Sequence, residues 1–139
     1  MYKRILLAVD GSDNSLRAAD EAVKMASINE NSVVELLYVV DFDKVKSDVL
    51  HSSSQVALEH SRRGHLIPYE DKLKENNIDY EVKILNGYPG PTISKYANDE
   101  NVDLLVIGSR GLNALQEVVM GSVSHKVVKK VEAPVLIVK

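Results

Sequence analysis

Two short stretches rich in glycine and serine contain the residues of this chain best suited to hold a ligand. Gly108-Ser109-Arg110-Gly111 is followed, after nine residues, by Gly121-Ser122, which opens an expected helix over residues 122–131. Glycine lets the backbone approach a ligand without a Cβ atom in the way. The free amides of a helix N-terminus suit a phosphate, the hydroxyls of Ser122 and Ser124 would add donors, and Arg110 would add a charge-assisted contact.

These stretches also have a purely structural explanation. The glycines can simply turn the chain, and Ser122 can simply cap a helix. Isolated glycine motifs produce many false positives, so the chemistry alone leaves both explanations open. The sequence contains no G-x-x-x-x-G-K-[ST] motif and no G-x-G-x-x-G motif after its first strand, which excludes a P-loop and an ordinary dinucleotide-binding fold.

Continuous apolar runs predict the strands that must position these residues. Runs rich in Val, Ile and Leu are typical of parallel strands covered on both faces. A further stretch alternates between apolar and charged residues and predicts a strand nearer an edge. In chain order, the expected strands cover residues 5–9, 33–40, 80–85 (the alternating one), 104–107 and 135–138.

Helical patterns lie between these strands. Ser12 is suited to cap a helix over residues 13–27. Residues 43–76 predict a loop and then a helix that is interrupted or kinked at Pro68. Pro91 suits the first turn of a short helix. The expected apolar stripe of the first helix consists of Leu16, Ala19, Val23 and Ala26.

The alternation of strands and helices predicts an α/β fold with a single open, Rossmann-like parallel sheet, helices on both faces, and one domain over residues 1–139. For five strands numbered along the chain, the expected order is 3-2-1-4-5. Ligands bind beyond the carboxyl ends of the strands where this order reverses. The reversal places Asp10, after the first strand, beside Gly108, after the fourth. The Asp10 carboxylate can accept hydrogen bonds from ribose hydroxyls or an adenine amino group, or help to hold a metal.

Composition excludes several classes of function. The formal net charge of −3 argues against nucleic-acid binding by bulk charge. The absence of cysteine excludes disulfides, cysteine-ligated zinc and thiol catalysis. The first apolar run is too short for a signal peptide, and no run approaches the length of a membrane span. We therefore expect a cytoplasmic protein with neither a membrane nor a nucleic acid as partner.

The spacing of the two glycine stretches fits the pattern G-x2-G-x9-G-[ST] and resembles the ATP-binding branch of the universal stress protein family. The resemblance covers the whole chain. Residues 3–12 look like the first strand and turn of that family, residues 38–41 like the end of its second strand, and residues 133–138 like its closing strand. It implies a fold of the adenine nucleotide alpha hydrolase-like type. Residues 43–70 depart from any pattern of the family.

The resemblance also implies roles for individual residues. Asp10, Ala8 and Val9 would lie by the adenosine, Val39 would contact the adenine ring, and Ile107 and Gly108 would line the nucleotide. The phosphates, usually with Mg²⁺ or Mn²⁺, would be held by Arg110, Gly111, Gly121, Ser122, Val123 and Ser124. The resemblance further implies a homodimer in which Val135–Val138 pairs antiparallel with its twin; an apolar edge strand left bare would be an aggregation hazard.

Other candidate sites have weaker support. His51, His60, His65 and His125 lack the helical spacing of shared metal ligands. Asp41 and Asp43 fit a solvated turn better than a carboxylate pair. Adjacent residues point to different helix faces, so Ser124 and His125 do not suggest a catalytic triad. The pair Arg62-Arg63 fits a solvated helix face.

Phosphoryl transfer needs a positioned nucleophile and a stabilised transition state. The glycine stretches offer a cradle for phosphates but neither a P-loop lysine nor a general base. We therefore expect a regulator of the stress response that binds ATP, AMP or another adenine nucleotide, with slow or no hydrolysis. A slow ATPase and a dimeric interaction protein of the same fold that binds no ATP remain the alternatives.

Overall fold

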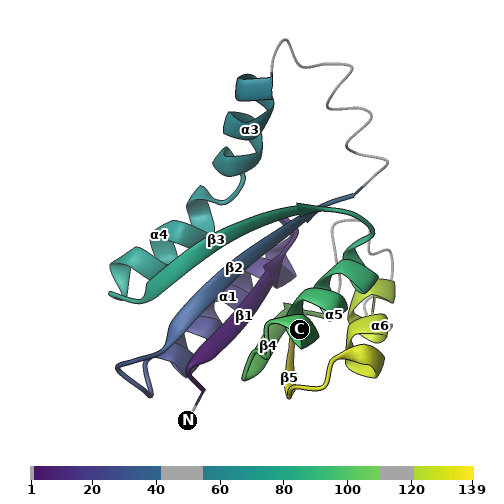
Figure 1. Cartoon of the computed structure of the whole chain (residues 1–139). Coiled ribbons are helices and arrows are strands. Elements are labelled where there is room, and N and C mark those ends of the chain that lie inside the picture. Colours follow the sequence, from purple (N-terminus) through teal and green to yellow (C-terminus); the bar gives the residue numbers. More distant parts are fainter. Residues whose placement is uncertain (1, 42–54, 110–120) are drawn as a thin grey trace.

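The computed structural model of the chain describes residues 2–41, 55–109 and 121–139. In chain order the elements are β1 (Arg4–Val9), α1 (Asp13–Ala26), β2 (Val33–Val40), α3 (Gln55–Gly64), α4 (Ile67–Glu75), β3 (Asp79–Asn86), α5 (Pro89–Asp99), β4 (Leu104–Gly108), α6 (Ser122–Lys130) and β5 (Val135–Val138). Figure 1 shows these elements around one twisted sheet.

The sheet has five strands in the order β3-β2-β1-β4-β5, and every neighbouring pair is parallel. This confirms the α/β fold, the strand order 3-2-1-4-5 and the reversal between β1 and β4. It also confirms that the alternating third strand lies at an edge, where its side chains are alternately exposed and half-buried.

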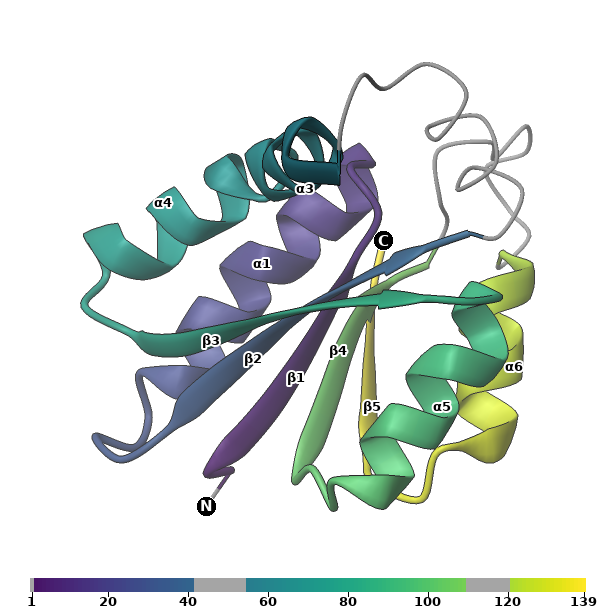
Figure 2. The ribbon, with the colours of Figure 1, turned by 45° about the horizontal axis from the view of Figure 1, so that its top comes forward.

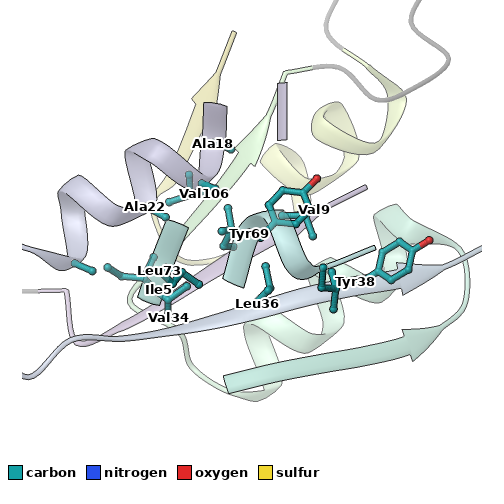
Figure 3. Packing of buried hydrophobic residues seen from close by; sticks show 14 of the residues in the cluster. Ile5, Val9, Ala18, Ala22, Val34, Leu36, Tyr38, Tyr69, Leu73 and Val106 are labelled. Carbon is teal, nitrogen blue, oxygen red and sulfur yellow. The ribbon is translucent and has the colours of Figure 1, made fainter. Parts of the chain in front are cut away.

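Helices cover both faces of the sheet (Figure 2). On one face, α1 and α4 bury a cluster that includes Ile5, Leu36 and Leu73 (Figure 3). On the other face, α5 and α6 cover a second cluster that includes Leu37 and Val127. Because both faces of β1 and β2 are buried, their sequences are almost continuously apolar rather than alternating.

The predicted stripe of α1 packs against the core cluster, although its four members are buried to different extents. Ala19 and Ala26 are buried, but Leu16 and Val23 are only half-buried at the border of the cluster. Two small side chains outside that stripe, Ala18 and Ala22, are fully buried. An alanine-lined face lets the helix lie close to the strands, so the smallest residues, and not the bulkiest, mark the buried side of α1.

The expected interruption at Pro68 is confirmed. Helix α3 ends at Gly64 and α4 begins at Ile67, which places Pro68 in the first turn of the second helix. Proline is tolerated there because the first-turn amides have no partner within the helix. Within the described residues, every helix is too short or too polar to cross a bilayer.

Candidate functional site

The carboxyl ends of β1 and β4 lie side by side at the strand-order reversal. Ala8 on β1 pairs with Ile107 on β4, so the turn after β1 and the residues after β4 start from neighbouring points on the sheet edge. Tyr38 on β2 pairs with Val9, which places Val39 level with Asp10. The structure therefore brings Asp10, Val39 and Gly108 together at the carboxyl ends of the central strands.

The turn after β1 is held by hydrogen bonds of its own. An Asp10 carboxylate oxygen (Oδ1) accepts from the Ser12 amide at 2.9 Å. Ser12 in turn caps α1 by accepting from the Ser15 amide at 3.2 Å, as the sequence predicts. Between these residues, Gly11 has φ +87°, a left-handed conformation that favours glycine. The half-buried Asp10 carboxylate is thus fixed at the carboxyl end of β1.

A tyrosine from α4 also contacts this turn. The Tyr69 hydroxyl accepts a hydrogen bond from the Gly11 amide at 2.9 Å and lies 2.6 Å from the Ser15 hydroxyl. Burial raises the pKa of Tyr69 above its ordinary value of 10.0, so the hydroxyl stays protonated throughout the neutral range. This residue is not predictable from the sequence, because nothing in the pattern of residues 43–76 indicates which side chain reaches β1.

The residues on either side of segment 110–120 are hydrogen-bonded to each other beyond β4. The Gly121 amide donates to the Ser109 carbonyl at 2.8 Å, and the Ser109 amide donates to the Val138 carbonyl at 2.8 Å. The Ser124 hydroxyl donates to the Gly108 carbonyl at 2.6 Å. These bonds hold the N-terminus of α6 against the end of β4.

The first turn of α6 presents its amides without a side-chain cap. Gly121 occupies the cap position and makes no side-chain hydrogen bond there, and Ser122 is exposed. The first amides of a helix have no partner within it and carry partial positive charge. The sequence predicts that the Ser124 hydroxyl donates to a phosphate. In this structure the hydroxyl is buried and donates its proton to the Gly108 carbonyl instead.

Gly108 is explained by packing against α1. A Cβ atom added at Gly108 would lie 2.9 Å from the Asn14 Cβ, 3.0 Å from its carbonyl carbon and 3.1 Å from the Ser15 amide nitrogen. The next residue, Ser109, accepts from the Asn14 side-chain amide at 2.9 Å. Asn14 was not among the predicted site residues, and its backbone approaches β4 so closely that a Cβ atom opposite it would collide.

We expect Gly108→Ala to lower the free energy of unfolding by about 1–3 kcal/mol, because the added methyl meets helix backbone that cannot rotate away. Gly64→Ala is the matched control, because a Cβ atom built there meets no described residue within 4 Å outside its own helix backbone and its chain neighbours. Urea denaturation of both variants measures the difference. Equal stability of the two would show that α1 can shift away from β4.

Three of the predicted apolar site residues share one face of the sheet. Ala8, Val39 and Ile107 belong to the cluster under α5 and α6, and Val123 packs against it. Val9 belongs to the opposite cluster, so its side chain points away from the other three and only its backbone faces the same region. Each of Ala8, Val39 and Ile107 retains a small exposed fraction, between 4% and 8%, at the sheet edge.

Two predicted phosphate contacts, Arg110 and Gly111, lie outside the described residues, as do His51 and Asp43. Among the residues that are described, no three His, Asp or Glu side chains cluster in a way that would hold a metal ion. His60, His65 and His125 therefore form no shared site within that part of the chain.

Comparison with known proteins extends these observations. A family model described as "Universal stress protein family" matches residues 1–139. The chain belongs to the universal stress protein family. It is 31% identical over 157 residues to universal stress protein YxiE of Bacillus subtilis (strain 168), with all of both chains covered.

Solved structures support the same assignment. The structure of MJ0577, a universal stress protein of Methanocaldococcus jannaschii, matches this universal stress protein with a TM-score of 0.86 and 31% identity, covering 100% of this chain and 96% of the other. A universal stress protein solved in complex with cAMP matches with a TM-score of 0.72 and 26% identity, covering 99% and 96% of the two chains. The family and the five-stranded fold expected from the sequence are thus confirmed.

Proposed function

We propose that this universal stress protein belongs to the ATP-binding branch of the family and binds ATP at the edge formed by β1, β2 and β4. The observation that carries the proposal is the hydrogen bond between Gly121 and Ser109, which sets the uncapped N-terminus of α6 beside the Asp10 turn. This pairs a carboxylate, suited to a ribose or an adenine amino group, with a cluster of amides suited to phosphates. The related protein in complex with cAMP supports an adenine nucleotide as ligand.

In this proposal the nucleotide lies across the reversal point. Asp10, Ala8 and the Val9 backbone lie by the adenosine, Val39 contacts the adenine ring, and Ile107 and Gly108 line the site. The phosphates lie at the N-terminus of α6, with the residues of the sequence motif around them: Arg110, Gly111, Gly121, Ser122, Val123 and Ser124.

The backbone at Gly121 fits a phosphate cradle. Its φ of −61° and ψ of 156° are open to any residue, so neither angle requires glycine. The missing side chain leaves the α6 amides open to a close approach, as a phosphate needs. Mg²⁺ or Mn²⁺ would be held mainly by phosphate oxygens and water, because the described side chains offer no three-residue metal cluster.

We propose binding with slow or no turnover. A general base must be within hydrogen-bond reach of the proton it abstracts. Asp10 is the carboxylate of the described part of the site, and one of its oxygens is already engaged by the Ser12 amide. The residue thus acts as a fixed acceptor for the ligand rather than as a base for an attacking water.

We further propose that residues 1–139 form a single domain that assembles as a homodimer through Val135–Val138 and acts in the cytoplasm as a regulator of the stress response. Strand β5 is an edge strand, and all four of its residues are half-buried within the single chain. An antiparallel pairing with a second β5 would satisfy its open edge and cover these apolar side chains.

Native mass spectrometry of freshly purified protein, kept with excess ATP and Mg²⁺ for several hours, tests the proposal. We expect a dimer mass with one intact ATP for each chain. Conversion of the bound ATP to ADP would favour an enzyme, and a dimer without nucleotide would favour an interaction protein of the same fold. A monomer mass would contradict the β5 interface.

A further inference from the structure

We propose that Tyr69 on α4 is a positioning residue for the nucleotide site, through its hydroxyl bond to the turn after β1. The inference rests on the proposed function, because it concerns the affinity of that site. Tyr69 itself would touch no nucleotide. It would act by holding Gly11, and through Gly11 the neighbouring Asp10, in the geometry that binds.

The hydrogen bonds around Tyr69 have one consistent direction. The Ser15 hydroxyl donates to the Ser12 carbonyl at 2.9 Å, which uses its only proton. The 2.6 Å contact between the two hydroxyls must then have Tyr69 as donor and Ser15 as acceptor. Tyr69 in turn accepts from the Gly11 amide at 2.9 Å. The hydrogen-bond chain therefore runs from Gly11 through Tyr69 and Ser15 to the Ser12 carbonyl, and links the middle of the turn to the first residues of α1.

Burial makes this chain difficult to replace by water. Tyr69 is 1% exposed and Ser15 is 3% exposed, so solvent has little access to either hydroxyl. Figure 3 shows the Tyr69 ring among the buried side chains, which fix its position while the hydroxyl reaches the turn. Without that hydroxyl, the Gly11 amide would lose its acceptor at a residue whose φ is already in the left-handed region.

The position of Tyr69 is set by α4, which has its own polar anchors. Glu70 accepts from Arg63 at 3.0 Å and from the Tyr80 hydroxyl of β3 at 2.9 Å. These bonds attach α4 to α3 and to the edge of the sheet, away from the turn. The nearby Tyr80 thus anchors the same helix without contacting Gly11, and it provides a matched control.

The test compares Tyr69→Phe with Tyr80→Phe in the full-length protein. Each variant loses one hydroxyl and keeps its ring. We expect Tyr69→Phe to weaken ATP binding by about three- to tenfold in calorimetric titration, the effect of losing one hydrogen bond. We also expect the Gly11 amide to exchange with solvent about tenfold faster in both the free and the ATP-bound protein, as followed by NMR. Tyr80→Phe should leave both quantities within about twofold of the unmodified protein.

Two outcomes would overturn the inference. One is unchanged ATP affinity in Tyr69→Phe, and the other is equal affinity loss in both variants, which would indicate a general effect of α4 stability. Failure of the proposed function is distinguishable, because the unmodified protein would then bind no ATP. The Gly11 exchange rate in the free protein would still show whether Tyr69 holds the turn, and a rate unchanged by Tyr69→Phe would show that it does not.

Discussion

Replacing Gly121 with valine is expected to weaken ATP binding by about 100-fold or more, while the protein stays folded. The backbone of Gly121 is extended, with φ −61° and ψ 156°, a conformation that valine adopts readily. Its amide still donates to the Ser109 carbonyl, so the closure of the loop is retained. The branched side chain would instead occupy space at the N-terminus of α6 that the phosphates need.

The expected magnitude follows from the contacts that would be lost. A hydrogen bond to a charged group contributes about 1.5–3 kcal/mol, and excluding a phosphate from the first turn of α6 should remove at least two, which together exceed the roughly 2.7 kcal/mol of a 100-fold loss. In the proposed site, the adenosine would lie against other residues, near Asp10 and Val39. Adenosine affinity should therefore change far less than ATP affinity, and the ratio between the two ligands measures the effect at the phosphates.

Titration calorimetry with ATP and with adenosine measures both affinities. Gly64→Val is the control, because it adds the same side chain where, among the described residues, the Cβ position has no neighbour within 4 Å beyond its own helix backbone and its chain neighbours. If Gly121→Val bound ATP as well as the unmodified protein does, the assignment of the cradle to α6 would be wrong. An equal loss for ATP and adenosine would instead indicate a distorted fold.

The glycines of the motif illustrate what a sequence can and cannot reveal. The spacing of Gly108 and Gly121 led to the correct family, but it did not show whether each glycine serves a ligand or only the path of the chain. The structure separates them, because a Cβ atom at Gly108 would collide with α1, whereas the backbone of Gly121 tolerates any residue. The collision depends on how closely a helix far away in the sequence packs, and local patterns contain no such information.

The strands and their order were predictable for a physical reason. Parallel strands covered on both faces must be apolar throughout, and β1 and β4 satisfy this at every position but Arg4 and Gly108. Contacts between distant elements were not predictable. Tyr69, Asn14 and Glu35 all have roles that depend on a partner brought near only by the tertiary fold. Glu35 in particular lies within β2, a run that was interpreted as simply apolar.

Replacing Arg4 with methionine is expected to lower the free energy of unfolding by about 2–3 kcal/mol, more than the same replacement at its buried partner Glu35. Glu35 is 3% exposed on the face of the sheet under α5. A single carboxylate oxygen accepts from both Arg4, at 2.9 Å, and the Tyr96 hydroxyl, at 3.1 Å. The other oxygen is buried without a partner among the described residues. Burial beside this carboxylate raises the pKa of Tyr96, so Tyr96 remains a neutral donor.

The two members of this ion pair differ in their access to water. The side chain of Arg4 is 42% exposed, whereas that of Glu35 is 5% exposed. Arg4→Met would leave a buried negative charge whose one remaining donor among the described residues is the Tyr96 hydroxyl, and leaving a buried charge uncompensated is strongly destabilising. Glu35→Met would leave an arginine that water can solvate and that still lies 3.5 Å from the Glu100 carboxylate. We therefore expect Glu35→Met to cost less than about 1 kcal/mol.

The double variant completes the argument, because a buried ion pair can be replaced by apolar residues of similar volume at little cost. Arg4→Met combined with Glu35→Met should recover at least about 1 kcal/mol of the loss caused by Arg4→Met alone, a coupling typical of residues in contact. Urea denaturation of the three variants at neutral pH, with the slope of each transition compared, measures this cycle. A larger loss for Glu35→Met than for Arg4→Met would show that the carboxylate stabilises the fold. A larger loss for Arg4→Met, as predicted, instead means that Arg4 compensates the buried charge of Glu35 on β2. Because the Arg4 side chain is partly exposed, we expect its replacement to cost about 2–3 kcal/mol rather than the 3–5 kcal/mol of a fully buried pair.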